Sequence, residues 1–160
     1  MAKKQEKTNV MRVLDSKKVP YGVHCYAETG ETNGKKVAEI LGQDSSQVFK
    51  TLVTVGKSKE HYVFVIPVER ELDLKKAASA VGEKNIEMIP QKELLPLTGY
   101  IHGGCSPIGM KKFFTTTIDE SAKGFDRIFF SAGKVGYQVE VALADLEKVI
   151  RFNYGNLCVE

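Results

Sequence analysis

The chain has 160 residues, 27% of them charged, and its formal net charge is +3. A chain of this length is about one domain, and so small a charge permits an anionic partner without requiring one. No apolar run approaches the ~20 residues of a membrane span, and the basic N-terminus lacks the apolar stretch of a secretory signal, so we expect a single cytoplasmic domain over residues 1–160.

The N-terminal quarter predicts two helices flanking a strand. Residues 8–19 carry an apolar stripe at helical spacing, with Thr8 as a possible N-cap. Residues 21–27 alternate like a strand, and residues 28–34 are rich in turn formers. A short helix then follows over residues 35–42.

The middle of the chain predicts a hairpin and a capped helix. Residues 46–56 and 61–68 are rich in β-branched and aromatic residues and are joined by the polar turn KSKE, which is typical of a β-hairpin. Residues 72–82 predict a helix that begins at the cap residue Asp73 and ends at Gly82.

The remaining elements are short. Residues 86–89 predict a strand, and residues 90–97 a helix with Pro90 in its first turn and Pro96 as its stop. Three strands, a helix and a final short strand are predicted at 112–119, 126–133, 137–143, 144–151 and 156–160. Because helices and strands mix without strict βαβ alternation, the expected fold class is α/β of the mixed α+β kind.

The three cysteines, Cys25, Cys105 and Cys158, are far apart, and no Cys-His set has zinc spacing. His24 is adjacent to Cys25, but neighbours on a strand point to opposite faces. We therefore expect no metal site and free thiols, as in a reducing compartment.

The familiar catalytic motifs are missing. The sequence holds no HExxH, P-loop, GxSxG or strand-linked GxGxxG pattern. Three histidines would allow a Ser-His-Asp site only if the fold brought such residues together.

Lys50 stands out within the hydrophobic stretch SQVFKTLVTV. On a strand its side chain shares a face with Val48 and Leu52. One interpretation is a lysine whose stem packs while its ammonium reaches water. The other is a lysine held at a pocket, as an anion ligand or as an amine with a shifted pKa. The residues alone leave both open.

The segment GYIHGGCSPIGMKK, residues 99–112, is dense in glycine. Gly103 and Gly104 would let the backbone approach a ligand, and Pro107 would stiffen the turn. Ser106 could cap a short helical turn whose free N–H groups face an oxyanion or phosphate. A plain tight turn between helix and strand is the alternative.

Four blocks of the sequence together resemble the YbaK/EbsC family of bacterial Cys-tRNA(Pro) deacylases, which is related to the editing (insertion) domain of bacterial prolyl-tRNA synthetases. The blocks are VFKTLV (48–53), LDLKKAA (72–78), TGYIHGGCSPIGMKK (98–112) and SAGKVG (131–136). The similarity runs from about residue 8 to 155 and includes the GxxxP motif of the superfamily as Gly103 to Pro107.

The resemblance implies a mixed, partly barrel-like β-sheet surrounded by helices. It also implies an enzyme without a cofactor that removes mischarged amino acid from tRNA(Pro), acting as a hydrolase or lyase on the aminoacyl ester. The implied partners are the tRNA(Pro) acceptor end and prolyl-tRNA synthetase, with no membrane.

Carried over by position, the resemblance makes Lys50 the essential lysine. The implied substrate-binding residues are Tyr26, Thr51, Gly103, Gly104, Cys105, Ser106, Pro107 and Ser131. Ala132 departs from the glycine frequent at that place in the family, and the loop 27–34 is shorter than in some relatives. Candidates for tRNA backbone contacts, or else for a solvated face, are Arg70, Lys111, Lys112 and Lys134.

The family mechanism is substrate-assisted, so that the cysteinyl thiol attacks its own ester carbonyl and leaves as a thiolactone. Cys105 is therefore not needed as a nucleophile, and nothing in the sequence supplies a base beside it. The open alternatives are editing of another small amino acid such as Ala-tRNA(Pro), a non-catalytic binder of aminoacyl-tRNA or nucleotide, and a Schiff-base enzyme using Lys50.

Overall fold

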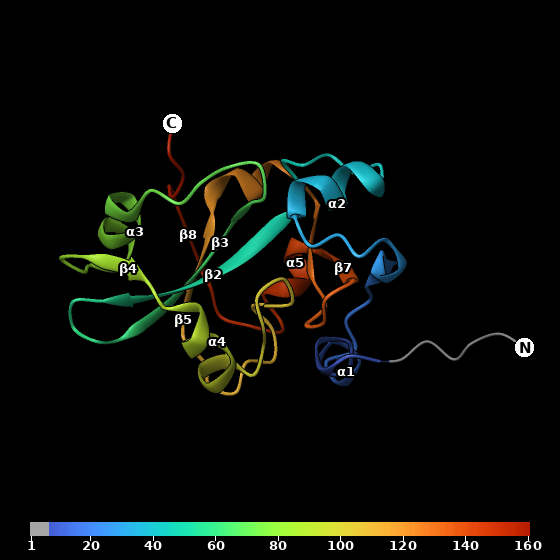
Figure 1. Cartoon of the computed structure of the whole chain (residues 1–160), viewed down its shortest axis with the longest axis horizontal. Helices are drawn as coiled ribbons and strands as arrows, with labels where there is room; N and C mark the ends of the chain where they lie inside the picture. Colours follow the sequence, from blue (N-terminus) through green and yellow to red (C-terminus); the bar gives the residue numbers. More distant parts are fainter. Residues whose placement is uncertain (1–6) are drawn as a thin grey trace, which may run out of the picture.

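A computed structural model describes residues 7–160 of the chain (Figure 1). The helices are α1 (Asn9–Ser16), α2 (Gly34–Ile40), α3 (Leu74–Val81), α4 (Gln91–Thr98) and α5 (Leu143–Leu146), with 3-10 turns η1 (Ala27–Thr29) and η2 (Glu120–Gly124). The strands are β1 (Gly22–Cys25), β2 (Phe49–Gly56), β3 (His61–Pro67), β4 (Ile86–Met88), β5 (Thr115–Asp119), β6 (Arg127–Ser131), β7 (Tyr137–Ala142) and β8 (Asn153–Gly155).

Two sheets organise the domain. The larger has the order β4-β2-β3-β5-β8, with antiparallel pairs on the β2 side and parallel pairs from β3 to β8. The smaller is antiparallel, in the order β1-β7-β6. They meet just before β2, where Val48 bridges Phe129 of β6 and the Phe129 N–H donates to the Gln47 carbonyl at 3.1 Å. The expected mixed sheet with helices around it is confirmed, and the sheet does not close into a barrel.

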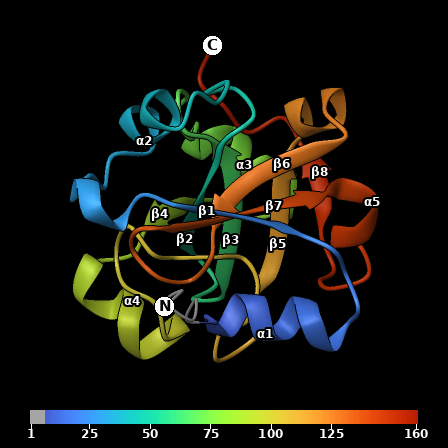
Figure 2. The same cartoon turned by 90° about the vertical axis from the view of Figure 1, so that its right-hand side faces the viewer.

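Strand β3 lies in the centre because both of its faces are apolar. Val63 and Val65 join the main core with the smaller sheet and α1, whereas Phe64 and Ile66 point to a second core under α3. Figures 1 and 2 agree that α2 lies on one side of the domain, with α1 and α4 on the other. Because successive side chains of β3 point to opposite faces of the sheet, this one strand contributes to both hydrophobic cores.

Local capping agrees with the sequence at both predicted helix starts. The Thr8 hydroxyl accepts from the Met11 N–H at 3.2 Å. The Asp73 carboxylate accepts from the first turn of α3, which ends at Gly82 with φ of 74°. The predicted hairpin is also confirmed, with Lys50 paired to Ile66.

Several boundaries were wrong. Helix α4 continues through Pro96 to Thr98, and it ends where Gly99 takes a φ of 87° and donates to the Leu95 carbonyl. A proline in a short helix removes one backbone donor, and here the left-handed glycine supplies the stop. The loop predicted over 28–34 begins in the 3-10 turn η1.

The C-terminal third differs in length rather than in order. Strand β5 begins at Thr115, three residues into the predicted range of 112–119, and α5 is only Leu143–Leu146. The last strand is Asn153–Gly155, and Cys158 contributes only an isolated bridge to Leu72. Within residues 7–160, no helix has the length and apolar character needed to cross a membrane.

Candidate functional site

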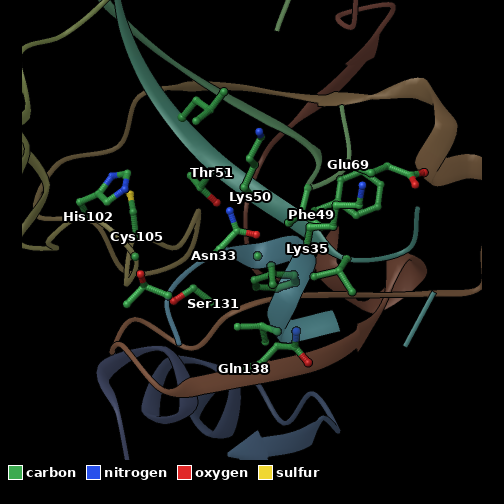
Figure 3. A pocket seen from close by; sticks show the side chains of 18 of the residues that line it. Asn33, Lys35, Phe49, Lys50, Thr51, Glu69, His102, Cys105, Ser131 and Gln138 are labelled. Carbon is green, nitrogen blue, oxygen red and sulfur yellow. The ribbon is translucent and has the colours of Figure 1, made fainter. Parts of the chain in front are cut away.

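A cavity of about 490 Å³ opens where the two sheets meet (Figure 3). Its lining comes from β2, the segment after β3, the N-terminal end of α2, the turn before Cys105, and the facing ends of β6 and β7. Segments distant in sequence therefore contribute side chains to one space.

Lys50 lies on β2 and lines this cavity. Its side chain is half-buried, and burial lowers the pKa of the ammonium, while the charge of Glu71 and the thiol of Cys158 oppose that shift. Among residues 7–160 no carboxylate forms an ion pair with Lys50. A partly desolvated cation with no fixed counter-ion suits an anionic or carbonyl-bearing ligand.

Thr51 gives an independent sign of a ligand. Its hydroxyl oxygen is buried at the cavity and has no hydrogen-bond partner among the described residues. A buried polar group without a partner costs about 1–3 kcal/mol. A bound molecule that offers a donor or acceptor here would remove that cost.

The glycine-rich segment forms a tight turn whose backbone is packed closely. The Gly104 N–H donates to the Ile101 carbonyl at 2.9 Å, and Gly103 has a φ of 87°. A Cβ on Gly104 would lie 3.1 Å from the backbone nitrogen of Val135. A side chain at Gly104 would therefore crowd the turn between β6 and β7.

The helical turn expected from Ser106 does not form, and residues 106–112 are irregular. The Ser106 hydroxyl is buried and accepts from the Ile108 N–H at 3.4 Å, while the Tyr100 hydroxyl donates to the Ile108 carbonyl at 2.5 Å. Two side chains thus hold the segment in place of helical bonds, and no helix N-terminus faces the cavity from it.

Cys105 lines the cavity but is poorly suited to nucleophilic attack. Burial raises the pKa of its thiol to about 12, so the thiol stays protonated at neutral pH. All three cysteines are free.

Ser131 and Tyr26 come from the smaller sheet. The Ser131 hydroxyl accepts from the Gly133 N–H at 3.1 Å, inside the turn that leads to β7. Tyr26 follows β1, where its N–H donates to the Gly136 carbonyl at 2.8 Å, and burial raises the pKa of its phenol. Both side chains line the cavity.

The predicted residues divide into three groups. Those around the cavity are Tyr26, Lys50, Thr51, Arg70, Gly103, Cys105 and Ser131. Those that are buried and do not line it are Gly104, Ser106 and Pro107. Those exposed outside it are Lys111, Lys112 and Lys134, the last with its Nζ atom 5.3 Å from the ring centroid of Tyr137. The roles expected for these residues remain predictions.

Sequence reasoning missed several lining residues. Asn33 caps α2, His102 sits at the tip of the turn, and Gln138 faces Ser131 across the β6–β7 pair. The side-chain amide of Gln43 donates to the side-chain oxygen Oε1 of Gln138 at 2.6 Å and so orients that side chain. His102 lies in the segment 99–112 that the sequence singled out, but no role was predicted for it. No local pattern marked Asn33 or Gln138, because only the meeting of the sheets brings these positions together.

Comparison with known proteins points to one family. A model of the "Aminoacyl-tRNA editing domain" matches residues 28–149. A protein of Enterococcus faecalis (strain ATCC 700802 / V583), named "Putative Cys-tRNA(Pro)/Cys-tRNA(Cys) deacylase EbsC", is 50% identical over 145 residues, 89% of this chain and 88% of its own length.

Two more distant similarities agree with that match. The chain is 29% identical to "Proline--tRNA ligase" of Shouchella clausii (strain KSM-K16) over 102 residues, which cover 64% of this chain and 18% of the ligase. A solved structure described as "a putative trans-editing enzyme for prolyl tRNA synthetase" has a TM-score of 0.81 at 23% identity, covering 95% of this chain and 96% of that one. At this identity the structural likeness shows the fold.

Proposed function

The chain belongs to the aminoacyl-tRNA editing domain family, and from this premise we propose that it is an aminoacyl-tRNA deacylase that acts in trans on Cys-tRNA(Pro). We further propose that the whole chain is one editing domain. The substrate in the name of the half-identical Enterococcus relative supports the choice of cysteine.

One observation carries the proposal most strongly. A single cavity gathers the half-buried Lys50 ammonium, the partnerless Thr51 hydroxyl and the tight turn at Gly103. These are groups that position an ester and its ribose, and the cavity offers no activated nucleophile, because the Cys105 thiol stays protonated. An aminoacyl ester is already activated, so positioning can supply much of the acceleration.

In the proposed reaction the thiol of the cysteinyl group attacks its own ester carbonyl. The carbon–oxygen bond to the ribose breaks, and the amino acid leaves as a thiolactone that water hydrolyses. Lys50 anchors the terminal adenosine through its ribose or phosphate, and Thr51 hydrogen-bonds the bound nucleotide. The N–H of Gly104 is already bonded to Ile101, so the stabilising backbone donors are its neighbours in the segment 103–106.

The proposed partners are the acceptor end of tRNA(Pro) and prolyl-tRNA synthetase. The exposed lysines Lys111, Lys112 and Lys134, with Arg70 at the cavity, are the proposed contacts to the tRNA backbone. With a net charge of +3, we expect weak, salt-dependent binding to tRNA. Selection of tRNA(Pro) then rests largely on the synthetase.

The test is release of labelled amino acid from Cys-tRNA(Pro), Ala-tRNA(Pro) and Pro-tRNA(Pro), with and without prolyl-tRNA synthetase. We expect release of cysteine alone. Equal release of alanine would overturn the thiol-assisted mechanism, since an alanyl ester has no thiol and needs a positioned water. If no amino acid is released even with the synthetase present, the proposed deacylase activity is overturned and the alternative of a non-catalytic binding module takes its place.

A further inference from the structure

The proposed reaction, on which this inference rests, requires the substrate thiol to lose its proton. A free cysteine thiol has a pKa near 8.5, and only the thiolate is an effective nucleophile. At neutral pH most bound substrate would therefore carry an unreactive thiol. A base at the cavity would raise the reactive fraction.

We propose that His102 is this base. A nitrogen of the neutral imidazole takes the proton of the substrate S–H group as the sulfur–carbonyl carbon bond forms. The bond from that carbon to the ribose oxygen then breaks, and the imidazolium returns the proton to that oxygen. The products are deacylated tRNA and the thiolactone, and the histidine ends as it began.

The position of His102 is fixed by the turn it occupies. The hydrogen bond from Gly104 to Ile101 closes a four-residue turn with His102 at its corner, and the φ of 87° at Gly103 follows directly. The close fit of Gly104 against Val135 anchors the same turn to the β6–β7 connection. The backbone geometry of this turn therefore places His102 at the rim of the cavity.

The side chain itself is available. His102 lines the cavity, and in Figure 3 its ring projects from the same side of the cavity as the Cys105 sulfur. Among residues 7–160 the ring takes part in no hydrogen bond or ion pair, unlike His24, whose Nε2 atom lies 3.0 Å from a Glu140 carboxylate oxygen. Both ring nitrogens are therefore open to a ligand.

Three other groups of the cavity are poor proton acceptors. The Arg70 guanidinium keeps its proton in proteins, and burial raises the pKa of the Tyr26 phenol and of the Cys105 thiol, the latter to about 12. In the proposed reaction Lys50 is engaged with the terminal adenosine, so it does not serve as the base.

The two carboxylates of the cavity, Glu69 and Glu71, are the competing bases. Both follow β3, and Figure 3 places Glu69 across the cavity from His102. Glu69 accepts from the Ser45 hydroxyl at 2.8 Å, and the charge of Glu71 acts on Lys50. A carboxylate is in general a weaker base than imidazole by about two pKa units, so His102 is the better match to a thiol.

The test compares wild type with His102→Phe and His102→Gln in single-turnover release of cysteine from Cys-tRNA(Pro) between pH 5.5 and about 9. Phenylalanine keeps a planar ring that can stack on a nucleobase of the tRNA, and glutamine keeps the ability to form hydrogen bonds, but neither side chain accepts a proton. We expect both variants to lose about 100-fold in rate at pH 6.5. The gap should narrow to a few-fold at pH 9, where the thiol ionises by itself.

His61→Gln is the matched control, since His61 starts β3 and lies outside the cavity. Its pH profile should follow wild type. If the rate of cysteine release by His102→Phe depends on pH as in wild type, the proposal is overturned and His102 makes a stacking contact. If His102→Gln shows the wild-type dependence, the proposal is likewise overturned and His102 acts as a hydrogen-bonding group. A wild-type enzyme that releases no cysteine would instead overturn the proposed function itself.

Discussion

Replacing Lys50 by methionine removes the ammonium and keeps an unbranched stem of similar length. If this ammonium anchors the terminal nucleotide, the variant loses one charge-assisted hydrogen bond, which is worth about 1.5–3 kcal/mol. At about 1.4 kcal/mol for each factor of ten, Lys50→Met should lower kcat/KM for Cys-tRNA(Pro) about 10- to 150-fold. Because Lys50 has no ion-pair partner in the described part of the chain, no carboxylate is left unpaired.

The same substitution should not destabilise the protein at neutral pH. Burial lowers the pKa of Lys50 below its ordinary value of 10.5, so the unfolded chain binds this proton more tightly than the folded one. The wild-type free energy of unfolding therefore rises with pH between the folded pKa and 10.5, and below this window the desolvation cost is fully present. Lys50→Met lacks that cost, and its advantage should vanish above pH 10.5.

Two measurements check these expectations. Cysteine release gives kcat/KM, and urea unfolding at pH 7 and about 10.5 gives stability, each beside the control Lys57→Met. Lys57 is an exposed lysine in the turn after β2, so the control makes the same chemical change outside the cavity. Activity within threefold of wild type would refute the anchoring role, and a clear loss of stability at pH 7 would refute the argument from desolvation.

Three further predictions concern residues other than Lys50. Gly104→Ala places a Cβ 3.1 Å from the backbone nitrogen of Val135, whereas a Cβ at Gly124 meets nothing within 4 Å. We expect thermal unfolding to show a loss of about 1–3 kcal/mol in the free energy of unfolding for Gly104→Ala and none for Gly124→Ala. Equal losses in the two variants would contradict the close packing of the turn. Iodoacetamide at pH 8 should modify the exposed Cys25 and spare Cys105, whose burial raises its pKa to about 12; peptide mass spectrometry reads the sites, and rapid labelling of Cys105 would show that the cavity wall opens. The hydrogen bond from the Tyr62 hydroxyl to the Glu83 carboxylate raises the pKa of Tyr62 to about 12, so the stabilisation by this bond is present below pH 10 and is lost as pH rises to 12. The free energy of unfolding of Tyr62→Phe should therefore change less than that of wild type between pH 10 and 12, and parallel curves for the two proteins would contradict the bond.

Much of the fold could be predicted from interactions between residues close in sequence. Such interactions form the Thr8 and Asp73 caps, the hairpin around KSKE and the glycine end of α3. The stop at Pro96 failed because a proline removes one helical donor without ending the helix, and Gly99 ended it instead. The helical turn predicted from Ser106 was wrong because the Tyr100 hydroxyl, eight residues before Ile108, donates to the Ile108 carbonyl and replaces a helical hydrogen bond.

The candidate site divides in the same way. Lys50 could be singled out because a cation in an apolar strand is costly to bury, and the glycines at 103 and 104 because they free the backbone. The cavity beside Lys50 favours the interpretation of a lysine held at a pocket, and its role there remains a prediction. His102 lay in the predicted segment without a predicted role, and Gln138 was not predicted at all, since a lone histidine or glutamine in a sequence is compatible with any surface.

Local patterns were enough to predict the order of most helices and strands and to single out Lys50 as a cation in an apolar strand, because capping, alternation and turn chemistry act over a few residues. Which of these elements share a cavity depends on the tertiary fold. The bridge between Val48 and Phe129, which are 81 positions apart in the sequence, brings the smaller sheet against β2. Such long-range pairing depends on the shape of the whole core, which no local pattern contains.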